Sequence, residues 1–236
     1  MKTWHTLLAA SAALAVGIGA AQAAPMPASA NLSQFVTGNS YTVTVWNGNG
    51  VTKYATLKNE PSTPALATFT YTGNIDFTNN SGNNGQNALL NTFQDFGFSS
   101  SNISNYTGSI SETQLLGTTM SLFGEVYNTY LSFTGMYSGP ALWLSIGHDD
   151  GASFYTGSGN TAVIQDAGPN SYTTSSNWLS AGNNTPFTLT YVESNGSPAD
   201  LVATLSGPAL PEPGTLVMFA AGLLGMGWML RRRKAS

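Results

Sequence analysis

The residues with the clearest chemical potential form one short acidic stretch in the second half of the chain. It reads Gly147-His148-Asp149-Asp150-Gly151 and directly follows an alternating apolar segment that ends at Ile146. Two adjacent carboxylates repel each other unless a proton or a cation neutralises them, and flanking glycines let the backbone turn closely around an ion. Carboxylate oxygens suit Ca²⁺, which takes roughly six to eight oxygen ligands. Asp149 and Asp150 are therefore candidate calcium ligands, although Asp-Asp-Gly is also an ordinary turn sequence.

Two carboxylates fill only part of a calcium shell, so backbone carbonyls, water or a second loop must supply the remaining ligands. The segment that follows offers three polar candidates, Asn160, Asp166 and Asn170. Their spacing selects none of them, so all three stay candidates for the second-loop ligand.

Two catalytic interpretations compete with a metal site. His148 is the only histidine beyond residue 5, and beside two aspartates it suggests a Ser-His-Asp centre. Adjacency in sequence is not the geometry of such a triad, so we favour an incidental turn histidine. Glu112, Glu125 and Glu193 carry the carboxyl groups that a glycosidase needs, but their spacing gives no signal. We assign no catalytic residue and expect a protein that is not an enzyme.

Three tryptophans stand in segments that alternate like strands. Trp46, Trp143 and Trp178 have rings large enough to stack on sugars. Their strand positions favour the simpler expectation that the rings are buried in the core.

The elements that must position these residues are short strands. Tyr41, Val43 and Val45 alternate with threonines, and the apolar residues of 141–146 alternate in the same way, with Trp143 on the opposite face. Strands of this kind, separated by Gly, Asn and Pro, predict an all-β fold, an antiparallel β-sandwich. One short helix is expected to end at Phe96, before a glycine stop. The polar tracts 53–64, 78–86 and 99–108 are expected to be loops.

Composition excludes several classes of protein. The 236-residue chain has no cysteine, which rules out disulfides and thiol chemistry. Only two of its seven basic residues lie between residues 24 and 209, against ten of its eleven acidic residues. This central part is therefore strongly acidic and should repel phosphate backbones, so we expect no nucleic-acid partner. Its length is sufficient for one sizeable core.

The N-terminal segment has the features of a secretory signal peptide. Lys2 is followed by an apolar, alanine-rich run from Leu7 to Ala20. Ala21 and Ala23 then flank Gln22 in the small-x-small pattern of a cleavage site. Residues 1–23 are therefore predicted to be removed, leaving one extracytoplasmic domain at residues 24–209.

The C-terminal segment, residues 210–236, contains three features in a fixed order. Pro211-Glu212-Pro213 precedes an uncharged run from Thr215 to Leu230, and the basic residues Arg231, Arg232, Arg233 and Lys234 follow. As a transmembrane helix, residues 215–230 would measure roughly 24 Å, somewhat short of a hydrocarbon core of about 30 Å. Snorkelling arginines or local thinning of the bilayer can accommodate the difference. The basic residues would hold this end in the cytoplasm.

This order of features resembles the PEP-CTERM sorting signal. The resemblance implies an exported bacterial envelope protein whose tail is recognised by an exosortase and cut near Pro211-Glu212-Pro213. It also implies an intermediate anchored in the inner membrane, followed by release to the cell surface or the extracellular matrix. The alternative is an ordinary C-terminal anchor that stays attached.

A second resemblance covers residues 131–205. The Asp149-Asp150-Gly151 turn, with Ser153-Phe154-Tyr155 after it, is similar to the Asp-Asp-Gly hairpin of protective-antigen-like β-sandwich domains. In sugar-binding members of that family, two adjacent aspartates hold Ca²⁺, which in turn holds sugar hydroxyls. The resemblance places these roles on Asp149 and Asp150. The sequence departs from the family at Thr156-Gly157, where Asp-Gly is usual.

The function that we expect is an exported surface or matrix protein that binds polysaccharide through a calcium-assisted loop. A purely structural or adhesive matrix protein without a ligand site is the alternative. A secreted glycan hydrolase is a third, less favoured interpretation.

Overall fold

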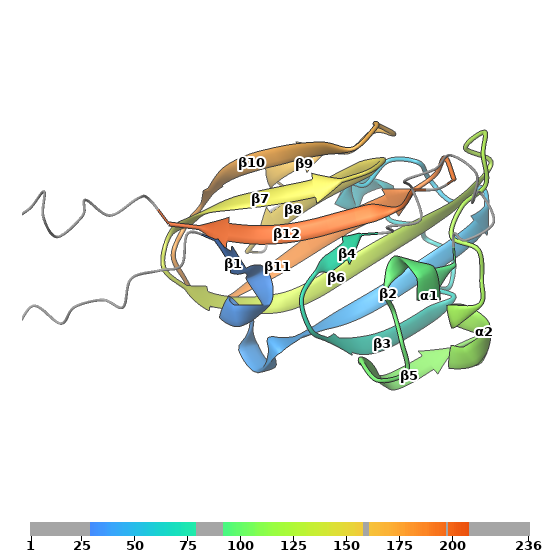
Figure 1. Cartoon of the computed structure of the whole chain (residues 1–236), viewed down its shortest axis with the longest axis horizontal. Helices are drawn as coiled ribbons and strands as arrows, with labels where there is room; N and C mark the ends of the chain where they lie inside the picture. The colour runs from blue at the N-terminus through green and yellow to red at the C-terminus, as the bar shows by residue number, and fades with distance from the viewer. Residues whose placement is uncertain (1–28, 79–91, 158–160, 197, 208–236) are drawn as a thin grey trace, which may run out of the picture.

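A computed structural model describes residues 29–78, 92–157, 161–196 and 198–207. Two antiparallel sheets pack face to face as a sandwich (Figure 1), which confirms the predicted all-β class. The five-stranded sheet contains β1 (Ala30–Asn31), β12 (Asp200–Ser206), β7 (Leu142–His148) and β10 (Thr173–Leu179) in that order, with β4 (Asp76–Thr78) also on β12. The seven-stranded sheet has the order β5 (Ile103–Gly108), β3 (Ala67–Thr72), β2 (Ser40–Asn49), β6 (Tyr127–Gly139), β11 (Gly182–Glu193), β8 (Gly151–Thr156) and β9 (Ala162–Asp166).

The core lies between the sheets, and the predicted alternation supplies it. Tyr41, Val43 and Val45 of β2 are buried, as are Leu142, Leu144 and Ile146 of β7. The side chains of a strand point alternately to its two faces, so each strand covers the core with every second residue. A group of phenylalanine rings fills the centre, made by Phe69, Phe77, Phe96, Phe98 and Phe133.

A smaller apolar cluster covers the other face of the seven-stranded sheet. Trp46 packs there edge to face on Tyr130, with ring centroids 5.6 Å apart. Its indole Nε1 donates a 2.9 Å hydrogen bond to the Thr63 carbonyl, in a loop that contains the 3-10 helix η3 (Leu57–Asn59). The buried position predicted for Trp46 is therefore confirmed, and so is the loop over residues 53–64.

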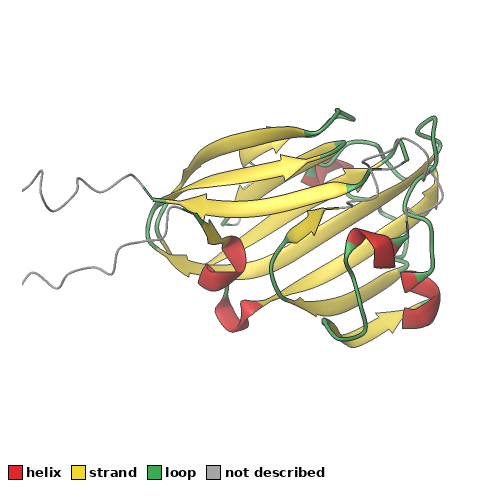
Figure 2. Cartoon of the chain, viewed as in Figure 1, coloured by secondary structure: helices red, strands yellow, loops and turns green. Residues whose placement is uncertain are grey.

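In the described ranges, helices are few, short and set at the margins of the sheets (Figure 2). The expected helix is present as α1 (Phe93–Phe96), where Thr92 and Asp95 form a capping box. A second helix, α2 (Glu112–Leu116), was not predicted from the sequence and is stabilised by a capping box between Ser111 and Gln114. Two 3-10 helices follow β1, namely η1 (Leu32–Phe35) and η2 (Thr37–Asn39).

One predicted loop is instead a strand. Residues 103–108 form β5 at the edge of the seven-stranded sheet, although only Ile103 among them is buried. Backbone pairing with β3 holds this edge strand, so it needs little apolar surface of its own. The expectation that 99–108 is a loop was wrong over these six residues.

Several predicted segments lie outside the described residues, namely the signal peptide 1–23, most of the polar tract 78–86 and the sorting segment 210–236. Within the part of the chain that the structure describes, no helix is long and apolar enough to span a bilayer. Ala30 of β1 pairs with Leu205 of β12, so the first and last described strands lie together at one end of the sandwich (Figure 1).

The phenylalanine cluster makes a prediction about stability. Phe98 is 1% exposed and contacts several rings, so Phe98→Ala should lower the free energy of unfolding by about 3–5 kcal/mol. Phe123→Ala is the matched control, because that ring is 86% exposed and should change stability by less than about 0.5 kcal/mol. Chemical denaturation of the full-length protein in mild detergent measures both values. Equal effects of the two substitutions would contradict the described core.

Candidate functional site

The acidic stretch is the point where the chain crosses from one sheet to the other. β7 pairs with β12 and β10 in the five-stranded sheet, whereas β8 pairs with β11 and β9 in the seven-stranded sheet. Asp149 and Asp150 are the two residues between these strands. The resemblance implied a hairpin here, and that detail was wrong because β7 and β8 are not hydrogen-bonded neighbours.

Backbone contacts from two other segments fix this crossing. The Asp149 N–H donates to the Asp200 carbonyl at 3.0 Å, and the Asp150 N–H donates to the Asn170 carbonyl at 2.8 Å. Asp150 adopts a left-handed conformation with φ of 57°, which aspartate tolerates better than most residues. Gly151 is required for space, since a Cβ there would lie 2.4 Å from the Ala167 carbonyl oxygen. The crossing is thus held in one conformation by its surroundings.

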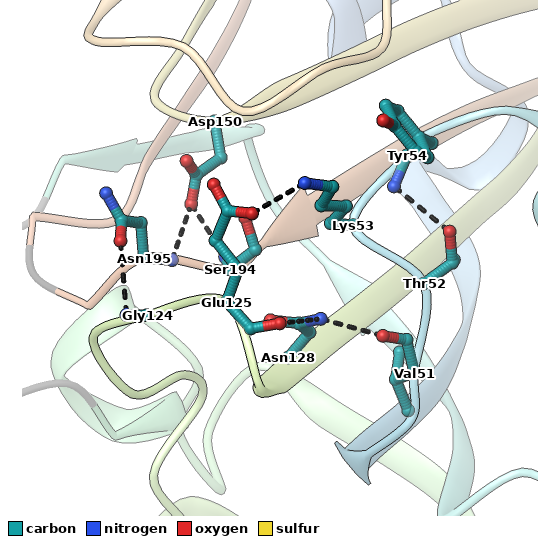
Figure 3. A network of polar contacts seen from close by, with 10 residues as sticks. All are labelled: Val51, Thr52, Lys53, Tyr54, Gly124, Glu125, Asn128, Asp150, Ser194 and Asn195. Atoms are coloured by element: carbon teal, nitrogen blue, oxygen red, sulfur yellow. Dashed lines mark hydrogen bonds and ion pairs between the residues drawn. The ribbon is translucent and has the colours of Figure 1, made fainter.

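The two carboxylates receive different hydrogen bonds. Asp150 Oδ2 accepts from the backbone N–H groups of Ser194 and Asn195, at 2.6 and 3.1 Å (Figure 3). Asp149 Oδ1 accepts from the Asp150 N–H at 2.9 Å. These hydrogen bonds use one oxygen of each carboxylate, Asp149 Oδ1 and Asp150 Oδ2.

Burial disfavours negative charge at both aspartates. It raises the pKa of Asp149 to about 6, with a further contribution from the neighbouring Asp150 charge. Burial also raises the pKa of Asp150, and the two backbone N–H groups oppose this rise only in part. The environment of the two aspartates therefore favours a protonated or cation-bound carboxyl group over a free carboxylate.

A third acid lies beneath the pair in a closed network. Glu193 is fully buried, and its Oε1 and Oε2 accept from Ser121 Oγ at 2.8 Å and Tyr191 Oη at 2.7 Å. The Gly196 N–H donates to Ser121 Oγ at 2.8 Å, which ties this network to the segment that binds Asp150. Burial, followed by the Asp150 charge, raises the pKa of Glu193 well above its usual range, which favours the uncharged acid.

The carboxylates open into a surface pocket of about 510 Å³, whose lining includes Asn170, Tyr172 and Asn195. Glu125 lines the same pocket, but its Oε2 forms a 2.6 Å ion pair with Lys53 Nζ (Figure 3). Asp149 and Asp150 therefore make one side of the pocket acidic, while Lys53 neutralises the Glu125 carboxylate.

The residues present meet part of the requirement for Ca²⁺. Asp149 and Asp150 offer two adjacent carboxylates in a partly desolvated position. The described residues contain no group of three or more His, Cys, Asp or Glu side chains placed to hold a metal. A calcium ion here would therefore have to draw on carbonyl groups, amide oxygens and water as well.

The structure separates the three candidates for a second-loop ligand. Asn170 lines the pocket and contacts the crossing through its carbonyl. Asp166 does not line the pocket, and its carboxylate accepts from Asn170 Nδ2 at 2.7 Å and from Ser175 Oγ at 3.1 Å. Asn160 lies outside the described residues. Of the two described candidates for the second-loop ligand, Asn170 is therefore the one that lies in the pocket.

His148 is buried at the end of β7, and its environment does not suit catalysis. Its Nδ1 donates to the Asp150 carbonyl at 3.0 Å, and burial lowers the pKa of the imidazole, which favours the neutral ring. Its Nε2 lies 3.5 Å from Asp166 Oδ2, and Ser175 Oγ bonds that same oxygen. The aspartate therefore lies between serine and histidine, whereas a triad needs the histidine in the middle.

The three glutamates considered as glycosidase residues do not lie together in one site. Glu193 is closed to solvent, Glu125 is paired with Lys53, and Glu112 begins α2 and does not line the pocket. Asn195 and Tyr172 were not predicted as site residues, because loops distant in sequence bring them to the pocket and neither belongs to a motif.

The expectation that all three tryptophans are buried was wrong for two of them. Trp143 and Trp178 are 45% and 43% exposed on the outer face of the five-stranded sheet. The inner face of β7 is already occupied by Leu142, Leu144 and Ile146, so Trp143 must point outward.

Comparison with known proteins identifies the C-terminal segment. Residues 209–234 match the PEP-CTERM protein-sorting motif. A search of the curated proteins finds no match to this chain. The chain therefore carries a sorting motif of exported proteins that end at the cell surface or outside the cell.

Solved structures with related folds are only distantly similar. The PA14 domain of MpAFP antifreeze protein is 14% identical with a TM-score of 0.47, covering 72% of this chain and 82% of that one. The PA14 sugar-binding domain from an RTX adhesin is also 14% identical, with a TM-score of 0.45, covering 69% and 86%. A beta-glucosidase from Kluyveromyces marxianus is 12% identical with a TM-score of 0.36, covering 78% of this chain and 18% of its own.

The hydrogen bonds to Asp150 generate a testable prediction. Asp150→Asn keeps an acceptor oxygen, whereas Asp150→Gly removes it, and both residues tolerate the left-handed backbone. The glycine variant leaves the Ser194 and Asn195 N–H groups without their acceptor, so it should lose about 1–3 kcal/mol more unfolding free energy than the asparagine variant. Denaturation in the presence of chelator measures the difference. Equal losses would show that these two bonds do not hold the crossing.

Proposed function

We propose that the protein is a non-enzymatic component of the bacterial surface or extracellular matrix that binds polysaccharide through the Asp149–Asp150 pocket with the help of Ca²⁺. The observation that supports this function is the pair of adjacent, partly desolvated carboxylates, whose pKa values burial raises. Burial raises the pKa of both carboxyl groups because it disfavours their negative charge, and a bound cation would offset this effect.

Calcium would supply an electropositive centre on which sugar hydroxyls can complete the oxygen shell. Asp149 and Asp150 would hold the ion, and Asn170 and Asn195 line the pocket beside it. The amide groups of these asparagines can donate to and accept from sugar hydroxyls, which suits a polar and uncharged ligand.

Binding is favoured over catalysis by the arrangement of the other chemical groups. Ser175, Asp166 and His148 lie together in an order that cannot transfer a proton from serine to histidine. Glu193 is sealed from solvent, so it cannot reach a glycosidic bond. A purely structural or adhesive matrix protein is the second candidate, and the lack of a third metal-binding side chain among the described residues favours it.

The route to the cell surface is also part of the proposal. Residues 1–23 would direct export, with cleavage after Ala23, and residues 215–230 would anchor an intermediate in the inner membrane. Arg231, Arg232, Arg233 and Lys234 would hold its end in the cytoplasm. An exosortase would then cut near Pro211-Glu212-Pro213 and release residues 24–209 as the mature domain.

Calcium binding can be tested by thermal unfolding of the full-length protein in detergent, with Ca²⁺ or with chelator. Binding to the folded state stabilises it, by about 2.7 kcal/mol when the ion is at 100 times its Kd. We expect millimolar Ca²⁺ to raise the Tm at pH 7, and Asp149→Asn to abolish the rise. Asp76→Asn is the matched control, because Asp76 is exposed on β4 outside the pocket.

The pH dependence of the calcium effect has a definite sign. The pKa of Asp149 is raised on folding, so without calcium the folded state gains stability as the pH falls through about 6. Protonation also removes the ligand, so the Tm rise caused by Ca²⁺ should shrink between pH 7 and pH 5. Calcium-dependent retention on polysaccharide should follow the same pattern. No Tm rise at pH 7 would remove the calcium proposal, and calcium-independent persistence in the matrix would favour the structural candidate.

Sorting can be tested in cells that contain an exosortase. Replacing Pro211 and Pro213 with alanine should prevent cleavage, so that the full-length chain accumulates in the membrane fraction. Pro208→Ala is the control, since this proline lies just outside the matched motif. Mass measurement of the membrane and extracellular forms distinguishes the outcomes. A wild-type protein that keeps its tail would instead show that the segment is a permanent anchor.

A further inference from the structure

The outer face of the five-stranded sheet carries an exposed tryptophan pair. Trp143 of β7 and Trp178 of β10 are directly opposite each other in the strand register, with ring centroids 5.8 Å apart and planes at 78°. Each indole remains more than two-fifths exposed. The exposed parts of the two rings adjoin each other and form an apolar surface that a ligand can contact.

The residues that continue this face toward the crossing are small and hydroxyl-rich. The next outward position holds Ser145 on β7 and Ser176 on β10, whose Oγ atoms are 2.8 Å apart, and the one after that pairs Gly147 with Thr174. None of the six outward positions on the two strands is charged. The surface therefore suits a neutral partner with many hydroxyl groups.

A third aromatic ring lies at the other end of this face. Tyr172 is 55% exposed, and a Cβ on Gly147 would come within 2.4 Å of its Oη, so the ring lies over the outer side of β7. Gly147 follows Trp143 by four residues, or roughly 13 Å along a strand. Tyr172 also lines the pocket that contains Asp149 and Asp150. Aromatic rings thus mark both ends of a hydroxyl-rich strip that leads to the pocket.

We infer that this strip, formed by Trp143, Ser145, Gly147, Thr174, Ser176, Trp178 and Tyr172, binds an extended neutral polysaccharide chain without calcium. Sugar rings present C–H faces that are attracted to the negative face of an aromatic ring. Their hydroxyl groups can exchange hydrogen bonds with the serines and threonine between the rings. The inference goes beyond the proposed function, because it uses the outer face of β7 and β10 and neither carboxylate, with Tyr172 as the one residue that the strip and the pocket share.

A lipid surface is the competing partner, since tryptophan also favours the membrane interface. The pair does lie at the end of the sandwich where the described chain starts and stops, as Trp143 pairs with Ser206. A membrane that contacted that end of the sandwich would touch the tryptophans but not Tyr172, which lies at the opposite end of the strip. The observations therefore favour a linear glycan.

Affinity electrophoresis of the full-length protein in mild detergent and chelator tests the inference. The probes are hydroxyethylcellulose, dextran and xylan, each cast separately in the gel. We expect at least one to retard the wild-type protein, and we expect Trp143→Ala with Trp178→Ala to weaken that binding at least about tenfold, as loss of a central aromatic anchor does. Retardation that persists in chelator, where no calcium can bind at Asp149 and Asp150, separates this binding from the calcium-assisted pocket.

Two controls keep the result interpretable. The double substitution of both tryptophans by phenylalanine retains aromatic rings and should keep most of the binding, while Phe123→Ala removes an exposed ring elsewhere and should have no effect. Equal Tm values check that every variant folds. Absence of retardation by all three probes, or retardation that is unaffected in the double alanine variant, overturns the inference. Tryptophan-dependent sedimentation with phosphatidylcholine vesicles, without retardation by any polysaccharide, overturns it in favour of a membrane contact.

Discussion

The site depends on the cost of placing two neighbouring carboxylates at the crossing between the sheets. The chain must leave β7 in one sheet and enter β8 in the other within two residues, and both of those residues are aspartates. Burial raises both pKa values, and backbone N–H groups from Ser194 and Asn195 offset only part of this effect for Asp150. A proton or a cation is the remaining means of balancing the charge.

This constraint connects parts of the chain that are distant in sequence. The Asp200 and Asn170 carbonyls fix the backbone of the crossing, and Glu193 supports the 194–196 segment from below through Ser121. The five-stranded sheet, to which β7 belongs, presents its outer face to solvent. On that face the tryptophan pair and Tyr172 lie at the two ends of a strip that reaches the pocket. The pocket and the strip thus meet at Tyr172 and differ in chemistry.

Local sequence patterns predicted the fold class well and the site in part. Alternation in β2 and β7 identified the residues of the inner face, whereas the acidic stretch after β7 suggested a hairpin where the chain in fact crosses between the sheets. Sequence patterns did not predict β5 or α2, because backbone pairing stabilises the strand and a capping box stabilises the helix, and neither depends on a pattern of apolar residues. Alternation placed Trp143 opposite Leu142 and Leu144, but it could not show that the outer face is left open. Asn195 and Glu193 reach the crossing through tertiary pairing, which no single-sequence pattern encodes.

The central claim is that the fold holds Asp149 in an environment that favours a proton or calcium over free carboxylate. Carboxyl ¹³C NMR of the full-length protein in detergent, with the signal assigned through Asp149→Asn, measures this directly. In chelator, the account predicts a titration midpoint near 6, and added Ca²⁺ should lower it. A midpoint at the ordinary value of about 3.9, unchanged by millimolar Ca²⁺, would contradict the account.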